Sequence, residues 1–257
     1  MQINPINLVL LAFSLLSLPD ICQAETTLVA VAANFTKPMN EIAEAFEKAT
    51  GHHAKLAFGS SGKFVAQLEN GAPFEIFLSA DDKNPVKLEQ SGLTVAGSRF
   101  TYAIGKLVLW SSTPNFVDQQ GKVLSTGKFK HLAIADPKLA PYGAAAIATL
   151  KTLGLQEQLQ PLLVQGENIA QTHQFVSTGN AELGFVALSQ VFENDKISTG
   201  SGWIVPENLH EPILQDAVLM KTGAENPAAL ALLTFMKTAP SLAIIEKFGY
   251  ALPTKTQ

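Results

Sequence analysis

The sequence predicts an α/β fold divided into two lobes. After residue 25, short apolar runs rich in β-formers alternate with segments of helical apolar spacing, which is typical of α/β proteins. The chain has 257 residues, 47% of them hydrophobic, so it is long enough to bury two cores. Two extended runs, 101–110 and 217–220, are placed where the chain would cross between lobes and return.

In the first part of the chain, each predicted strand is followed by a predicted helix. The spacing of Met39, Ile42 and Phe46 predicts a helix after the first strand. Asn84-Pro85 reads as the N-cap and first-turn proline of a later helix. The strands are predicted over 27–32, 55–58 and 75–79, and glycines end the three helices at Gly51, Gly71 and Gly92.

The same alternation continues to the end of the chain. Ile147, Leu150 and Leu153 mark a helix, Asn226-Pro227 opens another, and Gly249 ends the last. Further strands are predicted over 131–135, 183–188 and 217–220. With the runs near 101–110 and 217–220 as the two crossings, lobe I comprises 25–103 and 216–257, and lobe II comprises 104–215.

The N-terminus predicts a secretory signal peptide over residues 1–24. An apolar run from Leu8 to Leu18 is too short to span a bilayer, and Cys22-Gln23-Ala24 places small residues three and one before a cut at Glu25. No basic residue precedes the apolar run, which leaves a buried N-terminal helix as the alternative. Cys22 is the only cysteine, and the bulky Ile21 before it favours simple cleavage over lipid anchoring. We therefore expect a periplasmic protein.

Composition excludes several classes of function. The net charge of −4 and the pI near 5.7 argue against a nucleic-acid or anionic-membrane partner. The five histidines have no metal-ligand spacing, so we expect no metal held by side chains and no cofactor. Arg99 is the only arginine, and we interpret it as structural or as part of a surface ion pair.

The most informative feature is a set of four predicted helix starts that carry small or uncharged polar residues and neither Lys nor Arg. Helix starts expose unpaired N–H groups and the positive end of the helix dipole, so they favour anions. Together they indicate a site that holds a fully ionised oxyanion by neutral donors. The four starts are Ala33-Asn34, Ser60-Ser61-Gly62, Tyr142-Gly143 and Asn168-Ile169.

Taken singly, each start also has a plain structural explanation. Asn34 is either an amide donor to the anion or an N-cap, and Asn168 is an N-cap that leaves the backbone of Ile169 to the ligand. The Ser60-Ser61-Gly62 segment is either a small nest of N–H groups or a capping turn, and it matches neither a P-loop nor a hydrolase elbow. The Tyr142 hydroxyl is either a donor or the tip of a half-buried side chain.

Several segments in the same order resemble the periplasmic molybdate-binding proteins of ABC importers, a family of two-lobed type II solute-binding proteins. The segments are AANF ending at Phe35, FGSSG (58–62), NGAPFEIFLSAD (70–81), GSRFTYAIGKLVLWS (97–111), APYG (140–143) and LGFVAL (183–188). The resemblance covers nearly all of the chain after residue 24. It implies that each lobe is a mixed sheet flanked by helices, and that two crossing strands join the lobes.

The resemblance also implies a ligand and its contacts. Molybdate, and tungstate with it, would be held without counter-charges by Ala33, Asn34, Ser61, Tyr142 and Ile169, with Ser60, Gly62, Gly143 and Asn168 in support. Molybdenum would be bound only as the oxyanion. Ala33 offers only its backbone where some family members have a hydroxyl. Another branch of the family has a tyrosine where this chain has Ala187. Here the Tyr142 hydroxyl would supply the hydroxyl donor instead.

The implied function is binding, not catalysis. We expect a monomer that captures the oxyanion and docks on a membrane permease. Sulfate or another tetrahedral oxyanion is the alternative ligand, since spacing does not separate it from molybdate. An exported hydrolase that uses Ser61 as nucleophile is the alternative from another class, and it lacks a base placed by motif.

Overall fold

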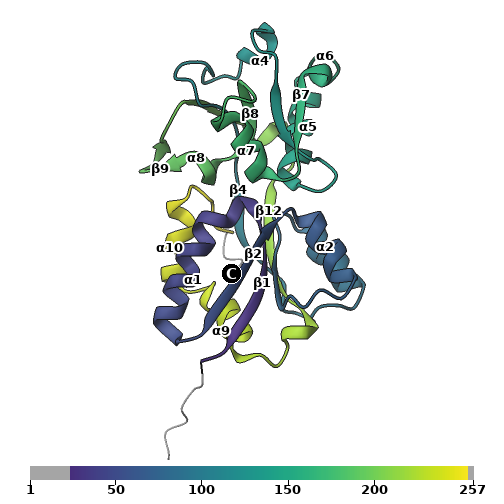
Figure 1. The fold of residues 1–257 in the computed structure, drawn as a ribbon, viewed down its shortest axis with the longest axis vertical. Coiled ribbons are helices and arrows are strands. Elements are labelled where there is room, and N and C mark those ends of the chain that lie inside the picture. Colours follow the sequence, from purple (N-terminus) through teal and green to yellow (C-terminus); the bar gives the residue numbers. More distant parts are fainter. Residues whose placement is uncertain (1–23, 254–257) are drawn as a thin grey trace, which may run out of the picture.

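The computed structural model describes residues 24–253, and they form two α/β lobes stacked along the long axis of the molecule (Figure 1). Each lobe is a mixed five-stranded sheet flanked by helices, as predicted. The predicted signal peptide, apart from Ala24, lies outside the described residues, and so does Cys22.

In the lobe I sheet the strand order is β2-β1-β3-β12-β4. The strand β1 pairs in parallel with β2 and β3, whereas β12 runs antiparallel to β3 and β4. The carboxyl ends of β1 and β2 therefore meet at one edge of the sheet. The bounds are β1 Thr26–Ala32, β2 His53–Gly59, β3 Ile76–Leu78, β4 Phe100–Gly105 and β12 Ile213–Leu219.

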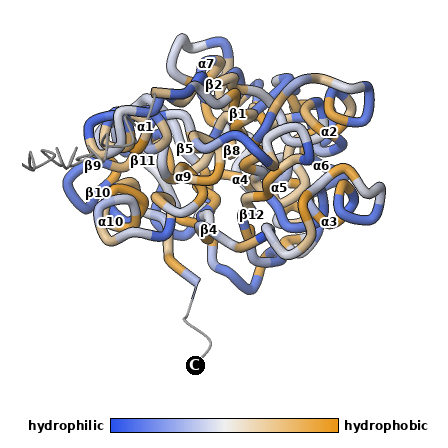
Figure 2. The backbone as a smooth tube through the Cα atoms, turned by 90° about the horizontal axis from the view of Figure 1, so that it is seen from below, coloured by the Kyte–Doolittle hydropathy of each residue, from blue (hydrophilic) through white to orange (hydrophobic). Residues whose placement is uncertain are grey.

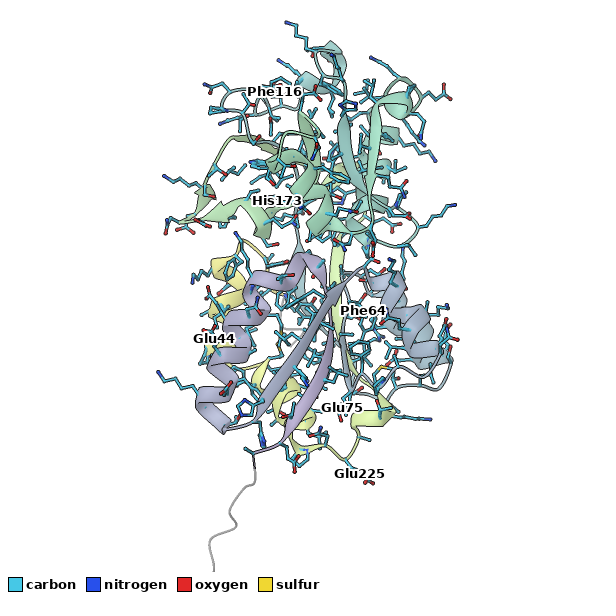
Figure 3. All side chains as sticks on the ribbon, in the orientation of Figure 1. Glu44, Phe64, Glu75, Phe116, His173 and Glu225 are labelled. Carbon is cyan, nitrogen blue, oxygen red and sulfur yellow. The ribbon has the colours of Figure 1, made fainter. Side chains whose placement is uncertain are left out.

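Helices cover both faces of this sheet because alternate residues of β1 point to opposite sides. Val29 and Val31 pack with α1, α9 and α10, while Ala30 packs with α2 and α3. Phe64 of α2 lies inside this second layer (Figure 3), edge-on to Phe74. The bounds are η1 Ala33–Phe35, α1 Thr36–Thr50, α2 Ser61–Glu69, α3 Lys83–Gln90, η4 Lys221–Gly223, α9 Pro227–Phe235 and α10 Ala239–Lys247.

The helix ends follow the sequence signals with one exception. The helix α1 ends at Gly51, whose φ of +77° is a conformation that glycine adopts without strain. The helix α3, however, begins at Lys83 and not after Asn84. The Asp81 carboxylate accepts a hydrogen bond from the Asn84 N–H at 3.1 Å. A side chain upstream of the helix therefore caps its first turn.

In the lobe II sheet the order is β11-β5-β8-β6-β7. The strand β6 is parallel to β7 and β8, and β5 is antiparallel to β8 and β11. The sequence patterns did not predict β7 or β11. The strands are β5 Leu107–Ser111, β6 Leu132–Ala135, β7 Leu163–Gly166, β8 Leu183–Ala187 and β11 Ser201–Ile204, with a small hairpin of β9 Phe192–Glu193 and β10 Lys196–Ile197.

Two helices of lobe II begin at or next to predicted site residues. These are α5 and α7, which follow β6 and β7. The others are short. The bounds are α4 Val123–Thr126, α5 Pro141–Thr152, α6 Gln156–Leu159, η2 Gln160–Leu162, α7 Ile169–Ser177, α8 Leu188–Val191 and η3 Glu207–Leu209.

Two segments connect the lobes. The predicted run 101–110 is in fact two strands, β4 and β5, which belong to different sheets and are separated by Lys106. On the return, β12 begins at Ile213, four positions before the predicted strand, because Ile213 pairs with Gly105. The lobe bounds expected from the sequence, 25–103 with 216–257 and 104–215, stay a prediction.

The return strand is anchored by the chain's only arginine. Asp216 of β12 is fully buried, and its carboxylate lies 2.6 Å from Arg99 Nη1 and accepts a hydrogen bond from the Thr101 hydroxyl at 2.7 Å. Arg99 Nε in turn contacts Glu89 at 2.7 Å. These carboxylates raise the pKa of Arg99 through hydrogen bonds, first from Asp216. Arg99 therefore has a structural role at the crossing.

Apolar segments lie inside both lobes. In Figure 2 the segments near the centre of the view are mostly white to orange, and many loops at the edge are blue. Among the described residues no single helix is long and apolar enough to cross a membrane. The pair α9 and α10, bent by 63°, meets the criteria of length and composition only when taken together.

The Arg99–Asp216 contact predicts a large effect on stability. Arg99→Met leaves the buried Asp216 carboxylate without its cation, and we expect the free energy of unfolding in urea to fall by about 3 kcal/mol. Lys83→Met is the matched control, because it removes a cation from an exposed ion pair and is expected to cost at most about 1 kcal/mol. Equal losses in the two variants would contradict the anchoring role.

Candidate functional site

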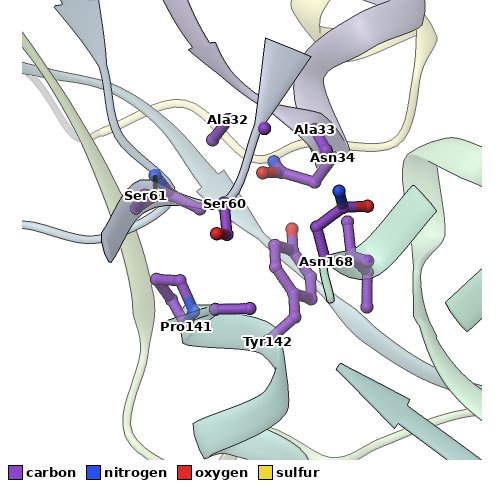
Figure 4. Close-up of a pocket in the computed structure, with 12 residues that line it drawn as sticks. Ala32, Ala33, Asn34, Ser60, Ser61, Pro141, Tyr142 and Asn168 are labelled. Atoms are coloured by element: carbon purple, nitrogen blue, oxygen red, sulfur yellow. Dashed lines mark hydrogen bonds between the residues drawn. The ribbon is translucent and has the colours of Figure 1, made fainter. Parts of the chain in front are cut away.

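All four predicted helix starts line one pocket between the lobes (Figure 4). About 200 Å³ of space in the pocket and at its mouth is not filled by protein atoms. It contains the five predicted ligand residues together with Ser60 and Asn168, while Gly62 and Gly143 stand just outside it. The lining residues are Ala32, Ala33, Asn34, Gly59, Ser60, Ser61, Ala80, Ala140, Pro141, Tyr142, Asn168 and Ile169.

Strand order explains why residues so far apart in the sequence meet. In lobe I the helices η1–α1 and α2 follow the parallel neighbours β1 and β2, and in lobe II α5 and α7 follow the parallel neighbours β6 and β7. Ligands of open sheets bind beyond the carboxyl ends of such strands. Each lobe therefore contributes two helix starts to the same pocket.

Capping accounts for only one of these starts. Asn168 Oδ1 accepts hydrogen bonds from Ala170 N at 2.9 Å and Gln171 N at 3.1 Å, so it caps α7 and leaves the Ile169 N–H free of the cap. The residues at the N-cap positions of η1, α2 and α5 make no side-chain capping bond. Because first-turn N–H groups have no acceptor inside their own helix, these starts direct donors at the pocket.

The two serines of the α2 start differ in their bonds. Ser61 Oγ accepts a hydrogen bond from the Ala80 N–H at 3.0 Å, which leaves the Ser61 hydroxyl hydrogen for another partner. Ser60 is 3% exposed, and its hydroxyl oxygen is buried without any hydrogen-bond partner. A buried polar group without a partner costs about 1–3 kcal/mol, so it indicates a bond that forms only when a ligand is present.

The side chain of Asn34 is occupied within the protein. Asn34 Nδ2 donates to Gln215 Oε1 at 2.8 Å and to the Tyr250 hydroxyl at 2.9 Å. Its carbonyl accepts a hydrogen bond from the Ser189 hydroxyl of lobe II at 2.8 Å. Asn34 therefore offers the pocket its backbone N–H, and the amide donor expected from the sequence fixes the loop instead.

Among the residues that the structure describes, no charged side chain lines the pocket, and Tyr142 is the only titratable residue in its lining. Burial raises the pKa of the Tyr142 hydroxyl well above its usual value. That hydroxyl stays protonated and remains a donor at neutral pH. Across residues 24–253 no group of three His, Cys, Asp or Glu side chains is arranged to hold a metal ion.

The two supporting glycines allow close approach of backbones. The Gly62 N–H donates across the cleft to the Leu139 carbonyl at 2.9 Å, and a Cβ on Gly62 would lie 3.0 Å from Leu139 Cα. A Cβ on Gly143 would overlap the Ala135 carbonyl at the end of β6. Gly62 thus lets the lobes touch, and Gly143 lets α5 start against the end of its preceding strand.

Three ion pairs also join the lobes. In each the lysine belongs to the lobe I side and the glutamate to the lobe II side. They are exposed, so each contributes little and is screened by salt. The pairs are Lys37–Glu193 at 3.6 Å, Lys63–Glu167, and Lys83–Glu211 at 2.9 Å. Together with the Gly62–Leu139 bond they show that the lobes are closed on each other.

Sequence reasoning missed the residues beneath the pocket. Gln215 and Tyr250 are buried and bond to Asn34, yet nothing in their local sequence marks them. Gly105 lies against the Tyr142 hydroxyl, where a Cβ would overlap that oxygen. A glycine inside the β-rich run 101–110 signals such a close approach and was available in the sequence.

A family model described as bacterial extracellular solute-binding protein matches residues 27–251. The chain belongs to this family. It is 59% identical over 230 residues to the molybdate-binding protein ModA of Azotobacter vinelandii, which covers 90% of this chain and 91% of the relative. It is 55% identical to ModA of Rhodobacter capsulatus, with 88% of each chain covered. Within the family it therefore lies in the branch of these ModA proteins.

Solved structures agree with this placement. The periplasmic molybdate-binding protein of Azotobacter vinelandii superimposes with a TM-score of 0.86 and 46% identity, covering 88% of this chain and 99% of that one. A sulfate-binding protein of Mycobacterium tuberculosis superimposes with a TM-score of 0.70 at 13% identity, covering 91% and 88%. The second likeness shows the shared fold alone.

The three tyrosines of the chain, Tyr102, Tyr142 and Tyr250, predict a loss of stability in alkali. Burial raises the pKa of all three, that of Tyr250 to about 12, whereas in the unfolded chain each ionises near pH 10. Their contribution is therefore complete below about pH 10 and is lost as the pH rises through the folded values. Urea unfolding at about pH 8 and about pH 11 measures this fall.

Tyr250→Phe provides the comparison for this pH dependence. It removes one of the three groups, so the free energy of unfolding should fall less steeply with pH. The slope in Tyr250→Phe should be smaller than in the unaltered protein by up to about 1.4 kcal/mol per pH unit. An unchanged slope in Tyr250→Phe would contradict the assignment.

Proposed function

We propose that this protein binds molybdate, and tungstate with it, in the pocket between its lobes and delivers the ion to the permease of an ABC transporter. The observation that carries the proposal is a pocket of neutral donors between the lobes, with the buried Ser60 hydroxyl left without a partner. The ModA relatives, more than half identical over nearly the whole chain, support molybdate as the ligand.

A site made of donors selects ions that carry no proton. Every oxygen of a molybdate or sulfate dianion accepts hydrogen bonds, whereas hydrogen phosphate has an O–H that needs an acceptor. The N–H groups of Ala33, Asn34, Ser61, Tyr142 and Ile169 and the nearby hydroxyls offer few acceptors. One unmatched buried contact costs about 1–3 kcal/mol, which corresponds to rejection by roughly ten- to hundredfold.

Molybdate and sulfate have the same charge and shape, so the donor set does not separate them. The resemblance to ModA proteins favours molybdate, and the sulfate-binding neighbour shares only the fold. The protein holds molybdenum only inside the oxyanion, through the residues of the pocket. Sulfate remains the alternative ligand.

Binding is coupled to closure in this proposal. The lobes rotate about the crossing at Lys106 and the return before β12, and the ion completes contacts from both lobes. The closed monomer then presents a surface made of both lobes to the permease. Membership of the extracellular solute-binding family supports a periplasmic location.

The alternative of a hydrolase with Ser61 as nucleophile gains no support from the pocket. Ser61 Oγ is bonded to the Ala80 backbone N–H, and no His, Asp or Glu lines the pocket among the described residues. A serine nucleophile needs an adjacent base. We therefore propose a binding protein and not an enzyme.

Isothermal titration calorimetry with molybdate, tungstate, sulfate and phosphate tests the ligand directly. We expect molybdate and tungstate to bind with a Kd below about 1 μM, and phosphate to bind at least about tenfold more weakly. Displacement of molybdate by equimolar sulfate would favour the sulfate alternative. Absence of heat with all four ions would contradict the proposal, and ester or phosphate turnover would revive the hydrolase.

The two serines give a paired prediction. Ser60→Ala should weaken molybdate binding by about ten- to hundredfold, the loss of one charge-assisted hydrogen bond, without lowering the stability of the free protein. Ser61→Ala should weaken binding and also lower stability, because the Ala80 N–H loses its acceptor. Calorimetry and urea unfolding of the ligand-free protein separate the two effects.

Thr27→Val is the control for these variants. Thr27 also has a buried hydroxyl without a partner, but it lies near the start of β1, away from the pocket. Its removal should leave the molybdate Kd unchanged. Equal affinity of Ser60→Ala and the unaltered protein would contradict a ligand contact by Ser60.

A further inference from the structure

Beneath the pocket, one buried amide joins the two lobes. Gln215 is fully buried on β12, the strand that returns from lobe II. Its Oε1 accepts hydrogen bonds from Asn34 Nδ2 at 2.8 Å and from the Tyr102 hydroxyl at 3.0 Å. Its Nε2 donates to the Tyr142 hydroxyl of lobe II at 3.1 Å. The amide therefore bonds to both lobes at once.

The direction of this last bond decides where the Tyr142 hydrogen points. An amide nitrogen donates and does not accept, so the Tyr142 hydroxyl cannot give its hydrogen to Gln215. The neighbouring Tyr250 hydroxyl accepts one hydrogen from Asn34 and also bonds to Tyr142, so it is the neutral acceptor with which a ligand competes for the Tyr142 hydrogen. Tyr142 lines the pocket, and an oxyanion there is the strongest acceptor within its reach.

Local backbone geometry holds Gln215 in this place. The pairing of β12 with β4 shifts register between Gln215 and Asp216, and such a bulge re-aims side chains. Asp216 bonds to Arg99, whereas Gln215 faces Tyr142. On the other crossing strand, a Cβ at Gly105 would overlap the Tyr142 hydroxyl and lie 2.6 Å from Gln215 Nε2. Position 105 therefore requires a glycine, because any side chain there would displace the Gln215–Tyr142 hydrogen bond.

We propose that Gln215 is a positioning residue that turns the Tyr142 hydroxyl into an obligate donor, and that it thereby determines selectivity for proton-free dianions over hydrogen phosphate. This inference rests on the proposed function. Because Gln215 lies on β12 of the lobe I sheet and Tyr142 at the start of α5 in lobe II, the orientation is set only when the lobes close. Selectivity is thus imposed in the closed form.

Gln215→Glu tests the direction of the hydrogen bond. A carboxylate at this position accepts the Tyr142 hydrogen, which turns an oxygen lone pair of Tyr142 toward the ligand. We expect the ratio of the hydrogen phosphate Kd to the molybdate Kd, measured by calorimetry above the second pKa of phosphate, to fall by at least about tenfold. The added charge repels both dianions, so it largely cancels in the ratio.

Gln120→Glu is the matched control. Gln120 is exposed in lobe II, away from the pocket, and the substitution makes the same change of net charge. It should leave both dissociation constants unchanged. An unchanged ratio in Gln215→Glu would overturn the inference, and so would an equal fall in Gln120→Glu.

A second pair of variants keeps the test decisive if the buried glutamate does not fold. Gln215→Met removes the donor and keeps the side-chain length, while Asn34 and Tyr102 retain their other partners, Tyr250 and the Ser79 carbonyl. We expect the molybdate Kd to rise about tenfold in the unaltered background and less than about twofold in a Tyr142→Phe background. The same rise in both backgrounds would overturn the inference, since Gln215 would then act without Tyr142.

These outcomes are distinct from failure of the proposed function. If the unaltered protein does not bind molybdate, the proposed ligand is wrong, and the role proposed for Gln215 fails with it. If it binds molybdate and rejects phosphate, but neither Gln215 variant behaves as expected, only the role of Gln215 is wrong.

Discussion

The site depends on the first N–H groups of η1, α2, α5 and α7, because the first residues of a helix have no acceptor in the preceding turn and no side chain caps η1, α2 or α5. Four helix dipoles point their positive ends into one small space, and no lysine or arginine shares it. In the proposed function, an anion supplies an acceptor to all four starts at once. The rest of the architecture brings these four starts together and keeps other acceptors away from them.

The two segments that cross between the lobes do much to bring the four starts together. Consecutive residues of β12 serve two purposes: Asp216 fastens the strand to Arg99, and Gln215 reaches the residues beneath the pocket. The bulge between them lets both buried side chains find partners. The only arginine of the chain is thus used to stabilise the crossing, and the ligand space stays neutral. A guanidinium in the pocket would attract many anions and discriminate less between them.

Closure is stabilised by contacts that a ligand does not make. The Gly62–Leu139 backbone bond, the Ser189–Asn34 bond and the exposed Lys–Glu pairs join lobes that each have their own core. Exposed pairs contribute at most about 1 kcal/mol each, so closure remains reversible. In the proposed function, a reversible closure lets the ion enter and leave, and the closed form sets the orientation of the Tyr142 hydroxyl that we propose for selectivity.

The sequence by itself determined the alternation of strands and helices, the glycine helix ends and the four loops, because periodicity and capping are local properties of the chain. It also identified Asn168 as a cap. It did not determine that Ser60 lacks a partner or that the Asn34 amide is already occupied. The occupied amide depends on contacts of Asn34 with Gln215 and Tyr250, which are 181 and 216 positions away, and the Ser60 hydroxyl lacks a partner because no acceptor or donor from elsewhere in the fold reaches it. Only the tertiary structure decided them, because a hydrogen-bond partner is set by packing between distant strands, and no local pattern records which distant residue will arrive there.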